Sequence, residues 1–260
     1  MMIDKIIRYE NRNKKSSIMF NILLALFVSL VISIIFYGIG THIFNLKAIE
    51  TQALINAPVF LVLLFFYIRT CKIVYEDTSS DLKVNNLFLL LALGFCASIF
   101  FNILIEQIAT FLKIQEDNRI TEAVLASNKY FAIFLTCISA PLCEELVYRG
   151  YIYKTLNRFY GFWPSAIVSS LFFGIAHFYF LGVVYAFLCG MLLSFIFYKY
   201  KSLIMCMILH MSINFFTLTI FHSEIEKLTY RQVLFAEFIA FVLIIMITLR
   251  MSIFDKNNKI

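Results

Sequence analysis

The sequence predicts an all-α fold, a bundle of about eight transmembrane helices, and two observations carry this prediction. First, 62% of the 260 residues are hydrophobic and only 15% are charged, whereas soluble domains carry about 25% charged residues. Second, the apolar residues form continuous blocks close to the ~20 residues that a helix needs to cross a bilayer. Continuous blocks exclude a membrane β-barrel, whose strands alternate apolar and polar residues.

The apolar blocks follow one another with short polar connections, so we expect a single membrane domain over residues 1–260. The first block follows a basic segment but is too long for a signal peptide, which predicts a retained helix. The predicted transmembrane helices span residues 18–40, 53–70, 84–112, 130–150, 163–179, 182–198, 202–222 and 232–250.

The basic residues predict the orientation of the bundle. With a cytoplasmic N-terminus, 16 of the 22 lysines and arginines fall in cytoplasmic segments. The positive-inside rule therefore predicts that both termini are cytoplasmic, which requires an even number of spans. The net charge of +6 follows from this bias and from attraction to anionic lipid, so it indicates no nucleic-acid partner. We expect a multi-pass protein of the cell membrane.

The predicted helix 130–150 contains two adjacent carboxylates, Glu144 and Glu145, followed by Arg149. An ionisable residue in a membrane helix costs at least about 2.5–3.5 kcal/mol, so each one needs a reason. Glu145 and Arg149 are one turn apart and can pair, either to brace the helix or as an ion pair that snorkels to the cytoplasmic headgroups. Glu144 is rotated by about 100° away from that pair, which makes it a candidate general base.

Two further motifs place polar side chains in apolar helices. Phe173 and His177 are four residues apart in the predicted helix 163–179, where the histidine is either functional or a satisfied structural residue. His210 and Asn214 share one face of the predicted helix 202–222. His210 lies about 13 Å from the cytoplasmic end, near the bilayer centre. The pair indicates either a polar pocket or an interhelical hydrogen bond.

Small residues predict where helices approach closely. Gly174 lies beside His177, and the block 182–198 carries Gly182, Ala186 and Gly190 at four-residue spacing. Such residues allow backbones of neighbouring membrane helices to come together. We expect this stripe to draw the helices before and after it into close packing.

Three motifs occur in order on three predicted helices: Glu144-Glu145-x-x-x-Arg149, Phe173-x-x-x-His177 and His210-x-x-x-Asn214. Together they resemble the CPBP family of intramembrane proteases, which includes the CAAX prenyl protease II enzymes and the bacteriocin-immunity proteins of the Abi family. The resemblance covers about residues 130–220, which would form the catalytic core. It implies a glutamate-dependent endopeptidase that acts on membrane-associated proteins or peptides.

The resemblance also implies a role for each motif residue. Glu144 would activate a water molecule with help from His177. His210 and Asn214 would polarise the scissile carbonyl and stabilise the oxyanion. The remaining motif residues would give the site structural support: Glu145, Arg149 and Phe173.

The same residues bear on the use of a metal. Two histidines and a carboxylate form a ligand set compatible with zinc, but the chain has no His-Glu-x-x-His motif and asparagine is an uncommon zinc ligand. None of the six cysteines forms a Cys-x-x-Cys pair, so no thiolate zinc site is indicated. We therefore expect a metal-free mechanism without a cofactor.

Several biological roles are compatible with this reading. The richness in Ile, Phe, Lys and Asn indicates a bacterial protein, for which peptide maturation or bacteriocin self-immunity is expected. The first alternative is a non-catalytic membrane partner or immunity protein with the same fold. A second is a proton-coupled transporter that uses the buried Glu and His residues as a relay. The transporter would favour inverted repeats, and no internal repeat is visible.

Overall fold

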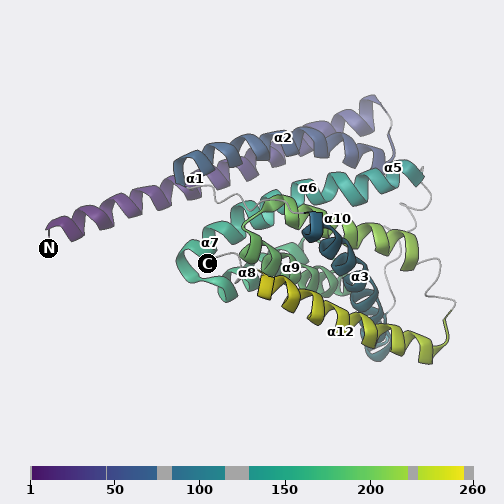
Figure 1. Cartoon of the computed structure of the whole chain (residues 1–260). Coiled ribbons are helices and arrows are strands. Elements are labelled where there is room, and N and C mark those ends of the chain that lie inside the picture. Colours follow the sequence, from purple (N-terminus) through teal and green to yellow (C-terminus); the bar gives the residue numbers. More distant parts are fainter. Residues whose placement is uncertain (1, 45, 75–83, 115–128, 222–227, 255–260) are drawn as a thin grey trace. The chain divides into compact units, whose positions relative to one another are not determined.

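The computed structural model describes residues 2–44, 46–74, 84–114, 129–221 and 228–254, and every element in these ranges is helical (Figure 1). The chain forms two compact units, Met1–Thr78 and Ser79–Ile260. The all-α class is therefore confirmed. The single membrane domain expected over residues 1–260 stays a prediction.

The first unit is a helical hairpin. Helix α1 (Met2–Gly38) continues into a π-helical turn, η1 (Ile39–Ile43), and packs against α2 (Ala48–Val74). A Cβ added at Gly40 would lie 2.9 Å from a methyl carbon of Thr51, so glycine permits the close approach of the two helices at the turn.

The second unit holds all the sequence motifs. It begins with α3 (Val84–Leu112), and one continuous helical segment follows, divided by two π-helical stretches. The parts of this segment are α5 (Lys129–Phe134), η2 (Leu135–Ser139), α6 (Ala140–Glu145), η3 (Leu146–Tyr153) and α7 (Lys154–Tyr160). The remaining elements are α8 (Phe162–Ile175), α9 (Phe180–Tyr200), α10 (Leu203–Phe216), η4 (Thr217–Phe221) and α12 (Tyr230–Phe254).

The core of this unit is built by α3, α9 and α10. Leu93, Leu193 and Leu209 contribute one fully buried side chain from each of these helices. Helix α3 packs against α10 and α12, and α8 packs along α9 (Figure 1). The small residues act as predicted in two places, because a Cβ at Gly174 would lie 2.7 Å from the carbonyl oxygen of Val183, and one at Gly190 would lie 2.9 Å from Ser170.

Within the described part of the chain all eight predicted apolar helices are present, and six of them are long enough to cross a membrane. The two shorter ones are Phe162–Ile175 and Leu203–Thr219. The 14 residues of α8 extend about 21 Å, less than the ~30 Å of a bilayer core. The expectation that residues 163–179 form a full span is therefore wrong, because α8 ends at Ile175. The side of the membrane that holds the termini stays a prediction.

Candidate active site

The site is centred on Glu145, whose side chain is fully buried between a guanidinium and an imidazole. Its Oε1 accepts hydrogen bonds of 2.8 Å from Arg149 Nη1 and of 2.8 Å from His210 Nδ1. Both Glu145 and Arg149 have 0% exposure. A buried carboxylate is tolerated only where charges and hydrogen bonds compensate it, and the Arg149 guanidinium and the His210 imidazole supply that compensation. The predicted Glu145–Arg149 pair is confirmed, and its snorkelling alternative is wrong because neither side chain reaches the surface.

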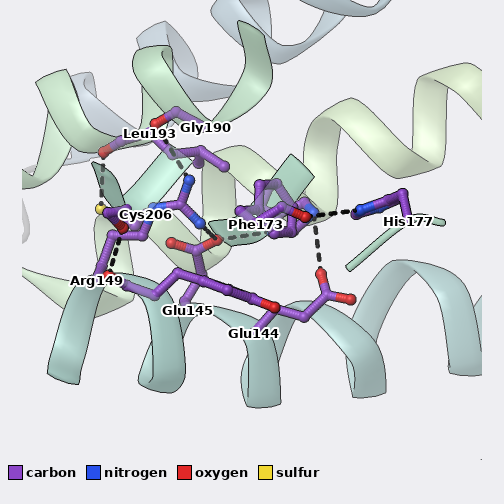
Figure 2. Close-up of polar contacts among 11 residues, drawn as sticks. Glu144, Glu145, Arg149, Phe173, His177, Gly190, Leu193 and Cys206 are labelled. Carbon is purple, nitrogen blue, oxygen red and sulfur yellow. Dashed lines mark hydrogen bonds and ion pairs between the residues drawn. The ribbon is translucent and has the colours of Figure 1, made fainter. Parts of the chain in front are cut away.

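Arg149 is held on three sides within the bundle. Its Nη2 donates to the carbonyl of Gly190 on α9 at 3.2 Å, and its guanidinium carbon lies 4.9 Å from the centre of the Phe173 ring. Figure 2 shows Arg149 reaching from Glu145 to Gly190. The arginine therefore ties α6 and η3 to α9. A Cβ at position 190 would lie 2.9 Å from Ser170, so glycine there lets α8, which carries Phe173, lie close to α9.

Glu144 occupies a different environment from its neighbour. Its side chain is 32% exposed, and its Oε2 lies 3.6 Å from His210 Nε2. The His210 ring therefore stands between two carboxylates, with Nδ1 on Glu145 and Nε2 facing Glu144. Because a carboxylate oxygen accepts, Nδ1 carries a proton and donates to Glu145. Only the Nε2 edge of the ring faces the more accessible carboxylate.

Phe173 joins the two histidines. Its ring meets the rings of His177 and His210 edge-on, at centroid distances of 5.1 and 5.6 Å. His177 Nδ1 lies 3.0 Å from the main-chain carbonyl of Phe173 (Figure 2). A carbonyl only accepts, so Nδ1 donates, and in the neutral ring Nε2 retains its lone pair. Phe173 thus sets the position of both histidines through its ring and its backbone.

The surroundings of His177 differ from the sequence-based expectation. The predicted helix ends at Ile175, and His177 lies in the turn that leads into α9. Its N–H bonds the Gly174 carbonyl at 2.9 Å, and the next residue, Phe178, has a φ of 60°. This left-handed residue reverses the chain, so helical spacing does not place His177. The hydrogen bond to Phe173 keeps the two residues together nevertheless.

Asn214 lies on α10, one turn after His210, and both face the helical segment 129–160. Its Nδ2 donates to the main-chain carbonyl of Thr136 in η2 at 2.9 Å. The predicted common face of His210 and Asn214 is thus present. Two partners in the site escaped the sequence analysis: the Thr136 carbonyl and the Gly190 carbonyl. Both atoms are main-chain oxygens, which no residue type indicates in a sequence, although Gly190 was singled out as a small residue at four-residue spacing.

The structure brings most of the predicted site residues into contact, whereas the hydrogen bond of Asn214 goes to the Thr136 carbonyl. Glu144, Glu145 and Arg149 join His210 directly or through one another, and His177 joins the group through Phe173. Among the residues that the structure describes, no group of three or more His, Cys, Asp or Glu side chains is arranged to hold a metal ion. The catalytic roles of Glu144, His177, His210 and Asn214 stay predictions.

Comparison with known proteins agrees with the motifs. Residues 126–216 match the family model described as Rce1-like, type II CAAX prenyl endopeptidase Rce1-like. No curated protein and no solved structure matches the chain. The matched segment contains every motif residue of the site, from Glu144 on α6 to Asn214 on α10. Residues 126–216 of this multi-pass membrane protein are therefore similar to the CPBP/CAAX protease family.

Proposed function

We propose that the protein is a glutamate-dependent intramembrane endopeptidase that cleaves membrane-associated proteins or peptides. The observation that carries this proposal is the contact of a partly accessible carboxylate, Glu144, with a histidine that a buried carboxylate orients from its other side. Arg149 completes the set. With both glutamates ionised and both His210 and Arg149 protonated, the four charges cancel, which suits a site of low dielectric constant.

In the proposed reaction Glu144 is the general base. It takes a proton from a water molecule, and the resulting hydroxide attacks the carbonyl carbon of the scissile peptide bond. His177 helps to place this water, because its Nδ1 donates to the Phe173 carbonyl and its Nε2 accepts a hydrogen bond from the water. Glu144 then gives the proton to the leaving amine as the C–N bond breaks. The products are a carboxylic acid and an amine, which become a carboxylate and an ammonium group by proton exchange, and the enzyme returns to its starting charge.

His210 and Asn214 stabilise the oxyanion in this mechanism. Because Glu145 accepts from Nδ1 of His210, the Nε2–H of the imidazolium is the donor that remains for the oxyanion. Asn214 offers a second N–H from the same face of α10. Each such donor is typically worth about 10²–10³ in kcat. Glu145 and Arg149 do not touch the reacting atoms and act by orienting His210.

We further propose that the reaction uses no metal. The oriented imidazolium and the amide supply the electrostatic stabilisation that a Lewis acid supplies in zinc proteases. Metal analysis of purified, active protein tests this part of the proposal. Stoichiometric zinc whose removal abolishes cleavage, and whose return restores it, would refute a metal-free mechanism.

The proposed setting is a bacterial cell membrane, with peptide maturation or bacteriocin self-immunity as the role. Its support is the residue composition together with the family of residues 126–216. The proposed substrates are accordingly secreted peptides or small membrane-anchored proteins rather than prenylated ones.

The deciding experiment compares protein termini by mass spectrometry in cells that produce wild-type protein or Glu144→Gln at equal abundance. We expect a set of new termini with wild type and their loss with Glu144→Gln. The matched control is Glu237→Gln on α12, an intramembrane glutamate outside the site whose Oε2 accepts from Gln107 at 2.6 Å. Identical termini in all three samples, with the cellular phenotype preserved by Glu144→Gln, would instead identify a non-catalytic membrane partner.

A further inference from the structure

The hydrogen bond of Asn214 reaches an unusual acceptor. Its Nδ2 donates at 2.9 Å to the backbone carbonyl of Thr136, which lies inside the continuous helical segment 129–160. A carbonyl in a helix normally accepts from the backbone N–H four residues later, or five residues later in a π-helix. The Thr136 carbonyl instead accepts from a side chain of another helix.

The backbone hydrogen bonds of η2 leave the Thr136 carbonyl without a main-chain donor. The N–H of Ala140 donates to the carbonyl of Leu135, five residues earlier. The next bond in the same pattern would join the Thr136 carbonyl to the N–H of residue 141. That residue is Pro141, in the first turn of α6, and proline has no N–H. Because a carbonyl that is partly buried between helices needs a donor, the Thr136 carbonyl is left for Asn214.

We propose that Pro141 is a positioning residue for Asn214, acting through the Thr136 carbonyl. The proposal rests on the proposed function, in which Asn214 donates a hydrogen bond to the oxyanion. The asparagine amide has two N–H groups. One is fixed on Thr136, so the direction of the other is fixed as well. A misplacement of about 1 Å in such a group costs about 10²-fold in rate, which gives the missing N–H at residue 141 a catalytic consequence.

The position of Pro141 strengthens this reading. It is buried and stands four residues before Glu145 in the same helical segment. Glu145 orients His210, and Thr136 orients Asn214, so a single helical segment directs both donors of α10. Pro141 therefore links the orientation of Asn214 to the segment that carries the proposed base, Glu144.

The test is a double-mutant cycle of Pro141→Ala and Asn214→Ala in the full-length protein. In Pro141→Ala the new N–H can donate to the Thr136 carbonyl in the π-helical pattern. In a regular α-helix it donates to the Cys137 carbonyl, and the N–H of Ala140 donates to Thr136. In both arrangements the Thr136 carbonyl has a main-chain donor and no longer needs Asn214. Cleavage is followed with a quenched fluorescent peptide built on a sequence that the terminus comparison identifies. We expect Pro141→Ala to lower kcat about 10-fold or more with KM within about twofold. In the Asn214→Ala background it should lower kcat less than about twofold.

A second readout needs no substrate. With ¹⁵N-labelled asparagine, the Asn214 side-chain signal, assigned by its loss in Asn214→Ala, should show one downfield, slowly exchanging proton in wild type. Pro141→Ala should move this proton upfield. Pro58→Ala is the matched control, because Pro58 also lies inside a helix, α2, but outside the family segment. It should change neither kcat nor the Asn214 signal.

The outcomes separate the two proposals. Suppose that Pro141→Ala shifts the Asn214 signal but the wild-type protein cleaves no substrate. This result would contradict the protease function and keep the physical link between Pro141 and Asn214, but Pro141 would lose its catalytic role. If Pro141→Ala lowers kcat by the same factor in the wild type and in the Asn214→Ala background, the inference is overturned. If Pro141→Ala fails to fold, the wild-type signal alone decides: two equivalent, fast-exchanging Asn214 protons would overturn it.

Discussion

Replacing Arg149 with methionine removes one partner of a buried ion pair and preserves most of the side-chain volume. The change removes the 2.8 Å bond to Glu145, the 3.2 Å bond to the Gly190 carbonyl and the cation above the Phe173 ring. Glu145, with 0% exposure, then keeps only the hydrogen bond from His210 as compensation. Removing one partner of a buried pair typically costs 3–5 kcal/mol, so we expect Arg149→Met to lower stability by about 4 kcal/mol.

Thermal or denaturant unfolding of purified protein in detergent measures this loss. For a unit of this size, about 4 kcal/mol corresponds to roughly 8–16 °C in Tm. Arg158→Met is the matched control, because Arg158 is exposed at the end of α7 and should change stability by no more than about 0.5 kcal/mol.

The double variant Glu145→Gln with Arg149→Met sharpens the test. Glutamine removes the uncompensated charge and still offers an oxygen to His210, so the double variant should be more stable than Arg149→Met alone, by about 1–3 kcal/mol. A loss below about 1 kcal/mol for Arg149→Met, or a double variant less stable than the single one, would refute the view that the pair compensates buried charge.

Two predictions concern the α8–α9 connection. Gly174→Ala should destabilise the protein by about 1–3 kcal/mol in the same unfolding assay, because the new Cβ would lie 2.7 Å from the Val183 carbonyl oxygen; unchanged stability would show that the two helices separate freely. At Phe178, where φ is 60°, the glycine variant should be more stable than the alanine variant by about 1 kcal/mol, since only alanine retains the cost of a left-handed residue. Equal stability of these two variants would contradict the left-handed turn.

The sequence predicted the helices well because their signal is local. Composition and block length alone place α3 at residues 84–112, and the structure has it at the same residues. The error at α8 has a local cause that hydropathy does not register. Residues 176–179 contain no Gly, Pro, Asn or Asp that would indicate a turn, but the chain turns there through Phe178. Hydropathy reports partition into lipid and contains no information on a backbone turn.

The site was predictable as far as side chains on one helix determine it. The four-residue spacing of Glu145 and Arg149 gives their contact directly. The contact of Glu145 with His210 joins residues 65 positions apart, so no helical periodicity contains it. The Thr136 and Gly190 carbonyls were missed for a different reason, since backbone acceptors occur at every residue and become available only when the local hydrogen-bond pattern is known.

The two adjacent glutamates show how one helix can carry both support and chemistry. Consecutive residues in an α-helix point about 100° apart, so Glu145 faces the interior while Glu144 reaches a partly exposed position. His210 spans the angle between them, because its two ring nitrogens address one carboxylate each. A change at the buried carboxylate therefore reaches the accessible one through a single rigid ring. On this basis Glu145 controls the proposed reaction by setting the orientation of His210, although it contacts no reacting atom.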